Sequence, residues 1–174
     1  NLSKKSILSW YKINKNKFGF PWNGDLISKR FLNIIYNYEF INSSSTEEET
    51  NQLNKIIFIH MHRVIYDFRN KKISNLTSYD IKANLLCCFI LNNISKKNID
   101  FINLIILNQI DKLGMHKSYN ILEHAKFMNN LGEIKNIFLY FNANISVNIE
   151  ENIFNLKLIL NEYFHDDGSI TLLN

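Results

Sequence analysis

The sequence predicts an all-α protein, either an irregular α-hairpin repeat or a compact bundle of seven to eight helices. The 174 residues contain one proline and five glycines, so few residues interrupt helices. Apolar side chains recur at spacings of three and four, whereas strict polar/apolar alternation is scarce. Hydrophobic residues make up 46% of the chain and charged residues 21%, which predicts one folded helical domain over residues 1–174.

The first part of the chain is predicted to consist of a basic and aromatic segment, residues 1–24, and a long-helix region, residues 25–76. A short helix is expected near the start of the first segment, and a Gly/Pro-rich break follows it. Asp25 is suited to cap the next helix, which is expected to run to about residue 42. The stretch SSSTEEE then matches a capping box, in which a hydroxyl side chain and a glutamate bond backbone N–H groups. A long helix to about residue 70 is therefore expected.

Residues 77–168 are predicted to form α-hairpin repeats. The expected helices cover residues 77–94, 95–113, 118–131, 133–143 and 148–165. Gly114, Gly132 and Gly168 each follow one of these helices and are expected to end it. Helix pairs would then start near residues 77, 118 and 148, at intervals that bracket the period of α-hairpin solenoids. A single closed bundle explains the same spacing equally well.

Charge is distributed unevenly along the chain, which has a formal net charge of +4. Residues 1–30 hold seven lysines and arginines against the single anion Asp25. From Tyr119 to the end there are three cations and seven anions. The basic first third would suit an acidic partner, either a polyanion or a protein surface.

The opening stretch interleaves lysines with aromatic residues, and this mixture suits single-stranded nucleic acid. Cations contact phosphates, and aromatic planes stack on unpaired bases. The alternative is that the aromatic side chains dock the segment onto the helical body while the lysine stems snorkel. A second basic surface, which would extend the first, is expected from Lys55, Arg63, Arg69, Lys71 and Lys72. The candidate nucleic-acid-binding residues are Lys4, Lys5, Trp10, Tyr11, Lys12, Lys15, Lys17, Trp22, Arg63, Arg69, Lys71 and Lys72.

Catalytic and metal-binding patterns are weak throughout the sequence. The chain has no glycine-rich phosphate loop, nucleophile elbow or HExxH motif, so we predict no catalytic residue, cofactor or metal ligand. His60 and His62 are two residues apart on a predicted helix, so their side chains diverge and do not share a metal. The pair Glu123-His124 lacks the second histidine of a zinc-protease helix and is expected at the surface.

The adjacent cysteines and the short apolar stretches indicate in which cellular compartments the protein is expected. Cys87 and Cys88 cannot join distant elements, are expected in the core, and favour a reducing compartment. Apolar stretches are far shorter than a bilayer requires, so no membrane span is expected. The localisation stays open between an organelle, such as the mitochondrion, and the cytoplasm.

From Thr77 onward, the sequence resembles the degenerate α-hairpin repeats of the heptatricopeptide and octotricopeptide families, organellar RNA-binding proteins of AT-rich parasites. The resemblance rests on LTSYDIKANLLCCFILNNISKKNIDFINLIILNQIDKLG followed by KSYNILEHAKFMNNLGEIKNIFLYFNANI. Ser or Thr opens the helix pairs, and Leu-Gly closes two helices. It implies binding to RNA or a ribonucleoprotein in a mitochondrion or plastid. No base-reading position matches, so no functional residue is carried over.

Three functions are therefore hypothesised from the sequence. The first is a non-enzymatic helical-repeat module that binds RNA or protein within an organellar ribonucleoprotein. The second is a protein–protein interaction bundle, such as an adaptor or an exported parasite protein, anchored by aromatic side chains. The third is a helical enzyme whose catalytic residues come from several helices.

Overall fold

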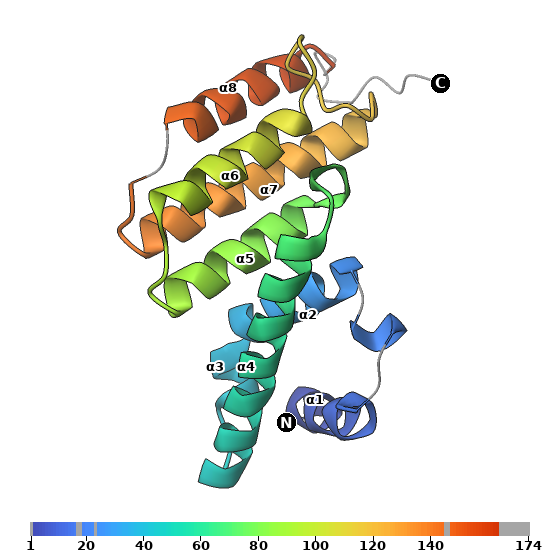
Figure 1. The fold of residues 1–174 in the computed structure, drawn as a ribbon, viewed down its shortest axis with the longest axis vertical. Helices are drawn as coiled ribbons and strands as arrows, with labels where there is room; N and C mark the ends of the chain where they lie inside the picture. Colours follow the sequence, from blue (N-terminus) through green and yellow to red (C-terminus); the bar gives the residue numbers. More distant parts are fainter. Residues whose placement is uncertain (1, 17–18, 23, 145–146, 164–174) are drawn as a thin grey trace. The chain divides into compact units, whose positions relative to one another are not determined.

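The computed structural model describes residues 2–16, 19–22, 24–144 and 147–163, and Figure 1 shows their course. Across these residues the chain forms α1 (Leu2–Asn14), η1 (Phe20–Trp22), α2 (Gly24–Tyr36), α3 (Tyr38–Asn42), α4 (Glu47–Asn70), η2 (Ile73–Asn75), α5 (Ser78–Ile90), α6 (Lys96–Asn108), α7 (Ile121–Tyr140) and α8 (Val147–Asn161). The described residues contain no strand beyond an isolated bridge between Ile110 and His116. The predicted all-α class is confirmed.

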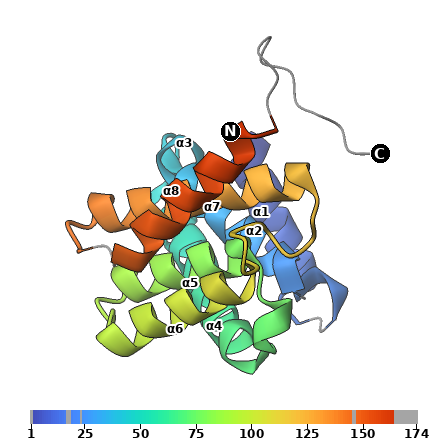
Figure 2. The same ribbon diagram turned by 90° about the horizontal axis from the view of Figure 1, so that it is seen from above.

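The helices belong to two compact units. The first unit consists of Asn1–Lys71 and Tyr79–Cys87, and the second unit consists of Lys72–Ser78 and Cys88–Asn174. Within the first unit, α2 packs against α4, and α1 contacts both α3 and α4. Within the second unit, η2 contacts α6, and α7 and α8 lie side by side in Figures 1 and 2.

Helix α4 begins at the predicted capping box. The backbone N–H of Glu49 donates to the Thr46 hydroxyl at 3.2 Å, and the Thr46 N–H donates to the Glu49 carboxylate at 3.1 Å. Two of the otherwise unpaired N–H groups at the helix start are thereby satisfied, and three glutamates in the first turn suit its positive end. The buried face that follows consists of Leu53, Ile56, His60, Met61, Val64 and Phe68.

The helix expected up to residue 42 is interrupted at Asn37, which divides it into α2 and α3. The Asn37 side chain donates to the backbone carbonyl of Asn33 at 2.9 Å, and its backbone leaves helical geometry. Asparagine favours such breaks because its amide competes with the backbone for hydrogen bonds. Both helices still contribute to one core, in which Ile34 and Ile41 pack with Leu53 of α4.

The predicted stop at Gly132 is wrong, because α7 runs without a break from Ile121 to Tyr140. The expected helices 118–131 and 133–143 are therefore one helix, and the first residue of a helix pair is 121 rather than 118. Its cap is Asn120, not Ser118, and the Asn120 side chain accepts from two backbone N–H groups. Buried side chains continue on one face on both sides of Gly132, so packing outweighs the weak helix propensity of glycine.

Three further predicted helix ends need correction. The helix expected over 95–113 begins at the predicted Ser95 cap but ends at Asn108, because Asp111 accepts backbone N–H bonds from Leu113 and Met115 and holds a turn. The helix expected to reach residue 94 ends at Ile90, where Asn92 adopts a φ of 50°. Helix α8 ends at Asn161, and the predicted stop at Gly168 lies outside the described residues.

Substituting the glycines at 114 and 132 by alanine is expected to change stability in opposite directions. Gly114 has a φ of +84°, and an added Cβ would lie 2.9 Å from the Ile159 side chain, so Gly114→Ala should cost about 1–2 kcal/mol. Gly132 lies within α7 with open space around it, so Gly132→Ala should stabilise by about 0.5–1 kcal/mol. Urea unfolding of both variants measures the two effects, and equal signs would contradict this account.

Candidate functional site

Helix α1 is attached to the start of α4 through Lys4, one of the candidate nucleic-acid-binding residues. Lys4 is 3% exposed, and its ammonium donates to the Glu49 carboxylate at 2.6 Å and to the Ser44 carbonyl at 2.9 Å. The hydrogen bond from Lys4 is the largest of the interactions that lower the pKa of Glu49. Because these acceptors surround the ammonium, Lys4 positions α1 rather than offering its charge at the surface.

The two tryptophans of the opening segment pack on a histidine of α4. The rings of Trp10 and Trp22 meet edge to face with centroids 5.1 Å apart. The His60 ring lies 5.8 Å from Trp10 and 5.1 Å from Trp22. Trp22 is buried, and its indole N–H donates to the Asn14 carbonyl at 2.9 Å. A base could stack on Trp22 only if this packing opened, so the two tryptophans dock the segment onto α4, as the alternative interpretation predicted for the aromatic residues.

Two arginines complete this cluster. The Arg30 guanidinium lies 3.9 Å from the centre of the Trp10 ring, and the Arg63 guanidinium lies 4.6 Å from that of Trp22. Arg30 also donates to the Pro21 carbonyl at 2.8 Å. Stacking on an indole orients a guanidinium without removing its charge. The two charges are therefore held at defined positions on the partly exposed side of the cluster.

His60 is fully buried inside the same cluster. Its Nδ1 lies 2.8 Å from the Ile56 carbonyl, which can only accept, so Nδ1 carries the proton. The other ring nitrogen, Nε2, has no hydrogen-bond partner among the described residues. Burial lowers the pKa of His60 to about 4, the Ile56 bond opposes that shift, and the charges of Arg30 and Arg63 reinforce it. The ring is therefore neutral at neutral pH.

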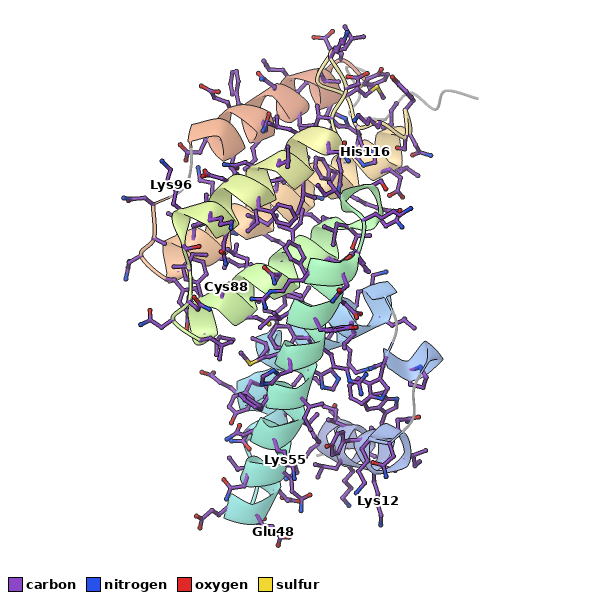
Figure 3. All side chains as sticks on the ribbon, viewed as in Figure 1. Lys12, Glu48, Lys55, Cys88, Lys96 and His116 are labelled. Carbon is purple, nitrogen blue, oxygen red and sulfur yellow. The ribbon has the colours of Figure 1, made fainter. Side chains whose placement is uncertain are left out.

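The remaining lysines of α1 point outward. Lys5, Lys12 and the adjacent Lys15 are exposed, and Figure 3 shows Lys12 projecting from α1. Lys5 and Lys12 are seven residues apart, so they lie on one face of the helix about 10 Å apart along its axis. Tyr11 is partly buried beside them. Among the candidate residues in α1 and directly after it, Lys5, Lys12 and Lys15 are the ones that face solvent.

The other candidate residues are distributed over both units. Lys17 lies outside the described residues, and Arg69 is exposed in the last turn of α4. Lys71 forms an ion pair with Asp80 at 2.8 Å. Lys72 is exposed but belongs to the second unit, so the structure does not place it beside the lysines of α1.

Asp80 organises a polar contact that the sequence pattern did not indicate. Its two carboxylate oxygens accept from the Ser28 hydroxyl at 2.6 Å and from the Lys71 ammonium at 2.8 Å. Asp80 and Ser28 are both buried, and the three residues come from α5, α2 and the end of α4 in the first unit. Asp80 lies in the first turn of α5, and no local sequence pattern indicates its distant partners.

The two units differ in charge. The first unit has twelve lysines and arginines against seven acidic residues, a formal net charge of +5. The second has eight against nine, a formal net charge of −1. The charge asymmetry along the sequence thus coincides with the division of the fold, and the first unit is the one suited to an anionic partner.

In the second unit, His124 is structural. It is 1% exposed, so the prediction of a Glu123-His124 surface pair is wrong for the histidine. Its Nδ1 accepts from the His116 backbone N–H at 3.2 Å, and its Nε2 lies 2.8 Å from the Leu156 carbonyl. The ring thereby joins the loop before α7 to α8. A histidine with both nitrogens occupied in this way has no free position for chemistry.

The cysteines, the metal-ligating side chains and the apolar helices concern other classes of function. Cys87 and Cys88 are buried and are not joined in a disulfide, as expected for core residues. Within the described part of the chain, no three His, Cys, Asp or Glu side chains are grouped to hold a metal ion. None of the described helices is long and apolar enough to cross a membrane. No family model, curated protein or solved structure matches the chain.

Proposed function

We propose that this protein is a non-enzymatic all-α binding module that holds single-stranded RNA on its first unit, as a component of an organellar ribonucleoprotein. The observation that carries the proposal is the net charge of +5 on the first unit, with exposed lysines on α1. The resemblance of the sequence from Thr77 onward to organellar RNA-binding repeats supports the choice of RNA over other polyanions, although α7 replaces one of the helix pairs expected there. That resemblance also supports the organellar location.

The rigid attachment of α1 favours this function. Contacts of Lys4 with Glu49, and of the tryptophans with His60, hold the helix against α4. Lysines on a fixed helix lose less conformational freedom on binding than lysines on a frayed end. Each contact with a phosphate releases counterions, which makes affinity fall steeply with salt. RNA binding by this surface must therefore depend strongly on salt concentration.

The triple variant Lys5→Glu, Lys12→Glu and Lys15→Glu is expected to lose most RNA affinity. Three phosphate contacts would disappear, so the slope of log affinity against log salt should decrease in magnitude by about 2. Fluorescence anisotropy with a labelled oligouridylate across a salt series measures both quantities. Far-ultraviolet circular dichroism verifies that the helices are retained, because the three side chains are exposed.

The matched control changes the same number of lysines in the second unit. Lys96, Lys97 and Lys112 are exposed, and substituting all three by glutamate alters the net charge equally. This control should keep both the affinity and the salt slope close to those of the parent protein. An equal loss in the two triple variants would show that only overall charge matters, and absent or salt-independent binding by the parent would refute the proposal.

Protein binding by the second unit is the other candidate function. Its described surface exposes large apolar side chains, among them Leu113 at 82%, Tyr140 at 80% and Phe154 at 61%. Exposed apolar patches often mark protein-interaction sites, and aromatic side chains are common anchors of the partner. Capture of a defined partner that survives nuclease treatment and is lost in Tyr140→Ala or Phe154→Ala would support this function.

A further inference from the structure

A groove of about 500 Å³ in the first unit lies where α1 meets α2 and α3. Its floor contains Ile34 and Ile41, both of which belong to the core of the unit. The side chains along its wall follow one another at spacings of four, three, four and three residues. They are Leu26, Arg30, Asn33, Asn37 and Phe40. These residues form one continuous face of α2 and α3, beside the face that is buried in the core.

The charges on the groove are exclusively positive among the residues that line it in the described structure. Lys29 and Arg30 stand together on α2. The Lys29 ammonium lies 4.7 Å from the centre of the Tyr79 ring, and Arg30 is stacked on Trp10. Both cations are thus oriented by aromatic rings before any ligand arrives. The charge complementarity calls for an anionic ligand, and the orientation reduces the entropy lost on binding.

The uncharged part of the groove suits a nucleobase. Phe40 is 64% exposed and offers an aromatic ring on which a base can stack. Asn33 and Asn37 are exposed and carry amides. The Asn33 amide can donate to and accept from a base edge, and the Asn37 amide, whose nitrogen already donates to the Asn33 carbonyl, can accept through its oxygen. An acidic peptide could contact the cations and the apolar floor, but two amides beside an aromatic ring match a nucleobase better than they match such a peptide.

We propose that this groove holds one unpaired nucleotide of the bound RNA. The base stacks on Phe40 with its edge toward Asn33 and Asn37, and its phosphate lies against Lys29 and Arg30. This inference rests on the proposed function and adds a second, partly non-ionic contact to the phosphate contacts of α1. The volume is within the range of sites that hold small organic ligands.

The test compares Phe40→Ala with Phe58→Ala. Phe58 is also an exposed phenylalanine of the first unit, on α4, and does not line the groove. Loss of a stacked base is expected to weaken oligouridylate binding by about tenfold in Phe40→Ala. The salt slope should stay unchanged, because stacking releases few counterions. Phe58→Ala should bind as the parent does, and ultraviolet cross-linking of a 5-iodouridine oligonucleotide should label the peptide that contains Phe40.

The possible results separate this inference from the proposed function. Equal affinities of the two alanine variants, together with cross-links elsewhere, would refute nucleotide binding in the groove. Salt-dependent RNA binding by α1 would be unaffected by that result. Failure of the parent protein to bind oligouridylate at low salt would overturn both. A Leu- and Glu-rich helical peptide is titrated in parallel. If that peptide binds and is lost in Phe40→Ala while RNA binding is unaffected, the groove belongs to an acidic protein segment and the inference is wrong.

Discussion

Replacement of Asp80 by alanine is expected to destabilise the first unit by about 3 kcal/mol. The carboxylate is buried and accepts hydrogen bonds from Ser28 and Lys71, so its loss leaves a buried hydroxyl and a largely covered ammonium without this acceptor. Removing one partner of a buried ion pair costs more than the pair itself contributes, because the remaining charge stays desolvated. Urea unfolding at neutral pH measures the loss as a lower midpoint.

Two further substitutions control this result. Asp100→Ala removes an exposed carboxylate on α6 and should change stability by less than about 0.5 kcal/mol. Asp80→Asn keeps an oxygen that can accept from Ser28 but loses the charge opposite Lys71, so its effect should lie between the other two. If Asp80→Ala were as mild as Asp100→Ala, the contact between the three elements would not stabilise the unit.

Acidification from pH 6.5 to pH 4 is expected to destabilise the first unit through His60. The unfolded chain takes up a proton on this histidine near pH 6.5, whereas burial keeps the pKa of the folded state at about 4. Between these values the unfolded state binds more protons, so the free energy of unfolding falls as the pH falls. The loss in the free energy of unfolding that arises from His60 is about 3 kcal/mol in total, and this loss no longer grows below pH 4.

The His60→Phe variant isolates this contribution. Phenylalanine keeps a planar ring against the two indoles but does not titrate, so the loss of stability between pH 6.5 and pH 4 should be reduced. His62→Phe is the control, because His62 is exposed on the same helix and lies outside the tryptophan cluster. Unfolding midpoints in urea, taken at half-unit steps of pH, compare the three proteins. Identical pH profiles for the parent and His60→Phe would contradict the assignment.

The interactions that could be predicted were those between residues close in sequence. The capping box of Thr46 and Glu49 and the cap at Ser95 both join residues three apart, and both are confirmed. One error arose where a local signal competed with packing, and another where a local side-chain hydrogen bond was missed. Gly132 was interpreted as a helix stop, yet the buried face of α7 continues across it. Asn37 was expected within a helix, and its side chain interrupts that helix instead.

The candidate site was predicted only in part. Interleaved lysines and aromatic residues indicated that the opening segment was special, and Lys5 and Lys12 are indeed exposed there. The pattern did not distinguish Lys4, which is buried against Glu49, from the neighbouring Lys5. It also left out Arg30, whose position over Trp10 depends on how α2 lies against α1. The groove at Phe40 had a signal, the heptad-like spacing from Leu26, but that spacing alone does not show whether a face is covered.

The amino-acid sequence by itself determined that this protein is all-α, where its longest helix begins, and that positive charge is concentrated early in the chain. Helix formation and capping depend on contacts within about four residues, so a single sequence contains them. The tertiary structure alone decided which cations and aromatic rings are exposed and which are buried. Lys4 meets Glu49 across 45 residues and Ser28 meets Asp80 across 52, and no periodic pattern encodes such contacts. Burial of a charge or an aromatic ring is set by these distant partners, because desolvation depends on everything that surrounds the group in space.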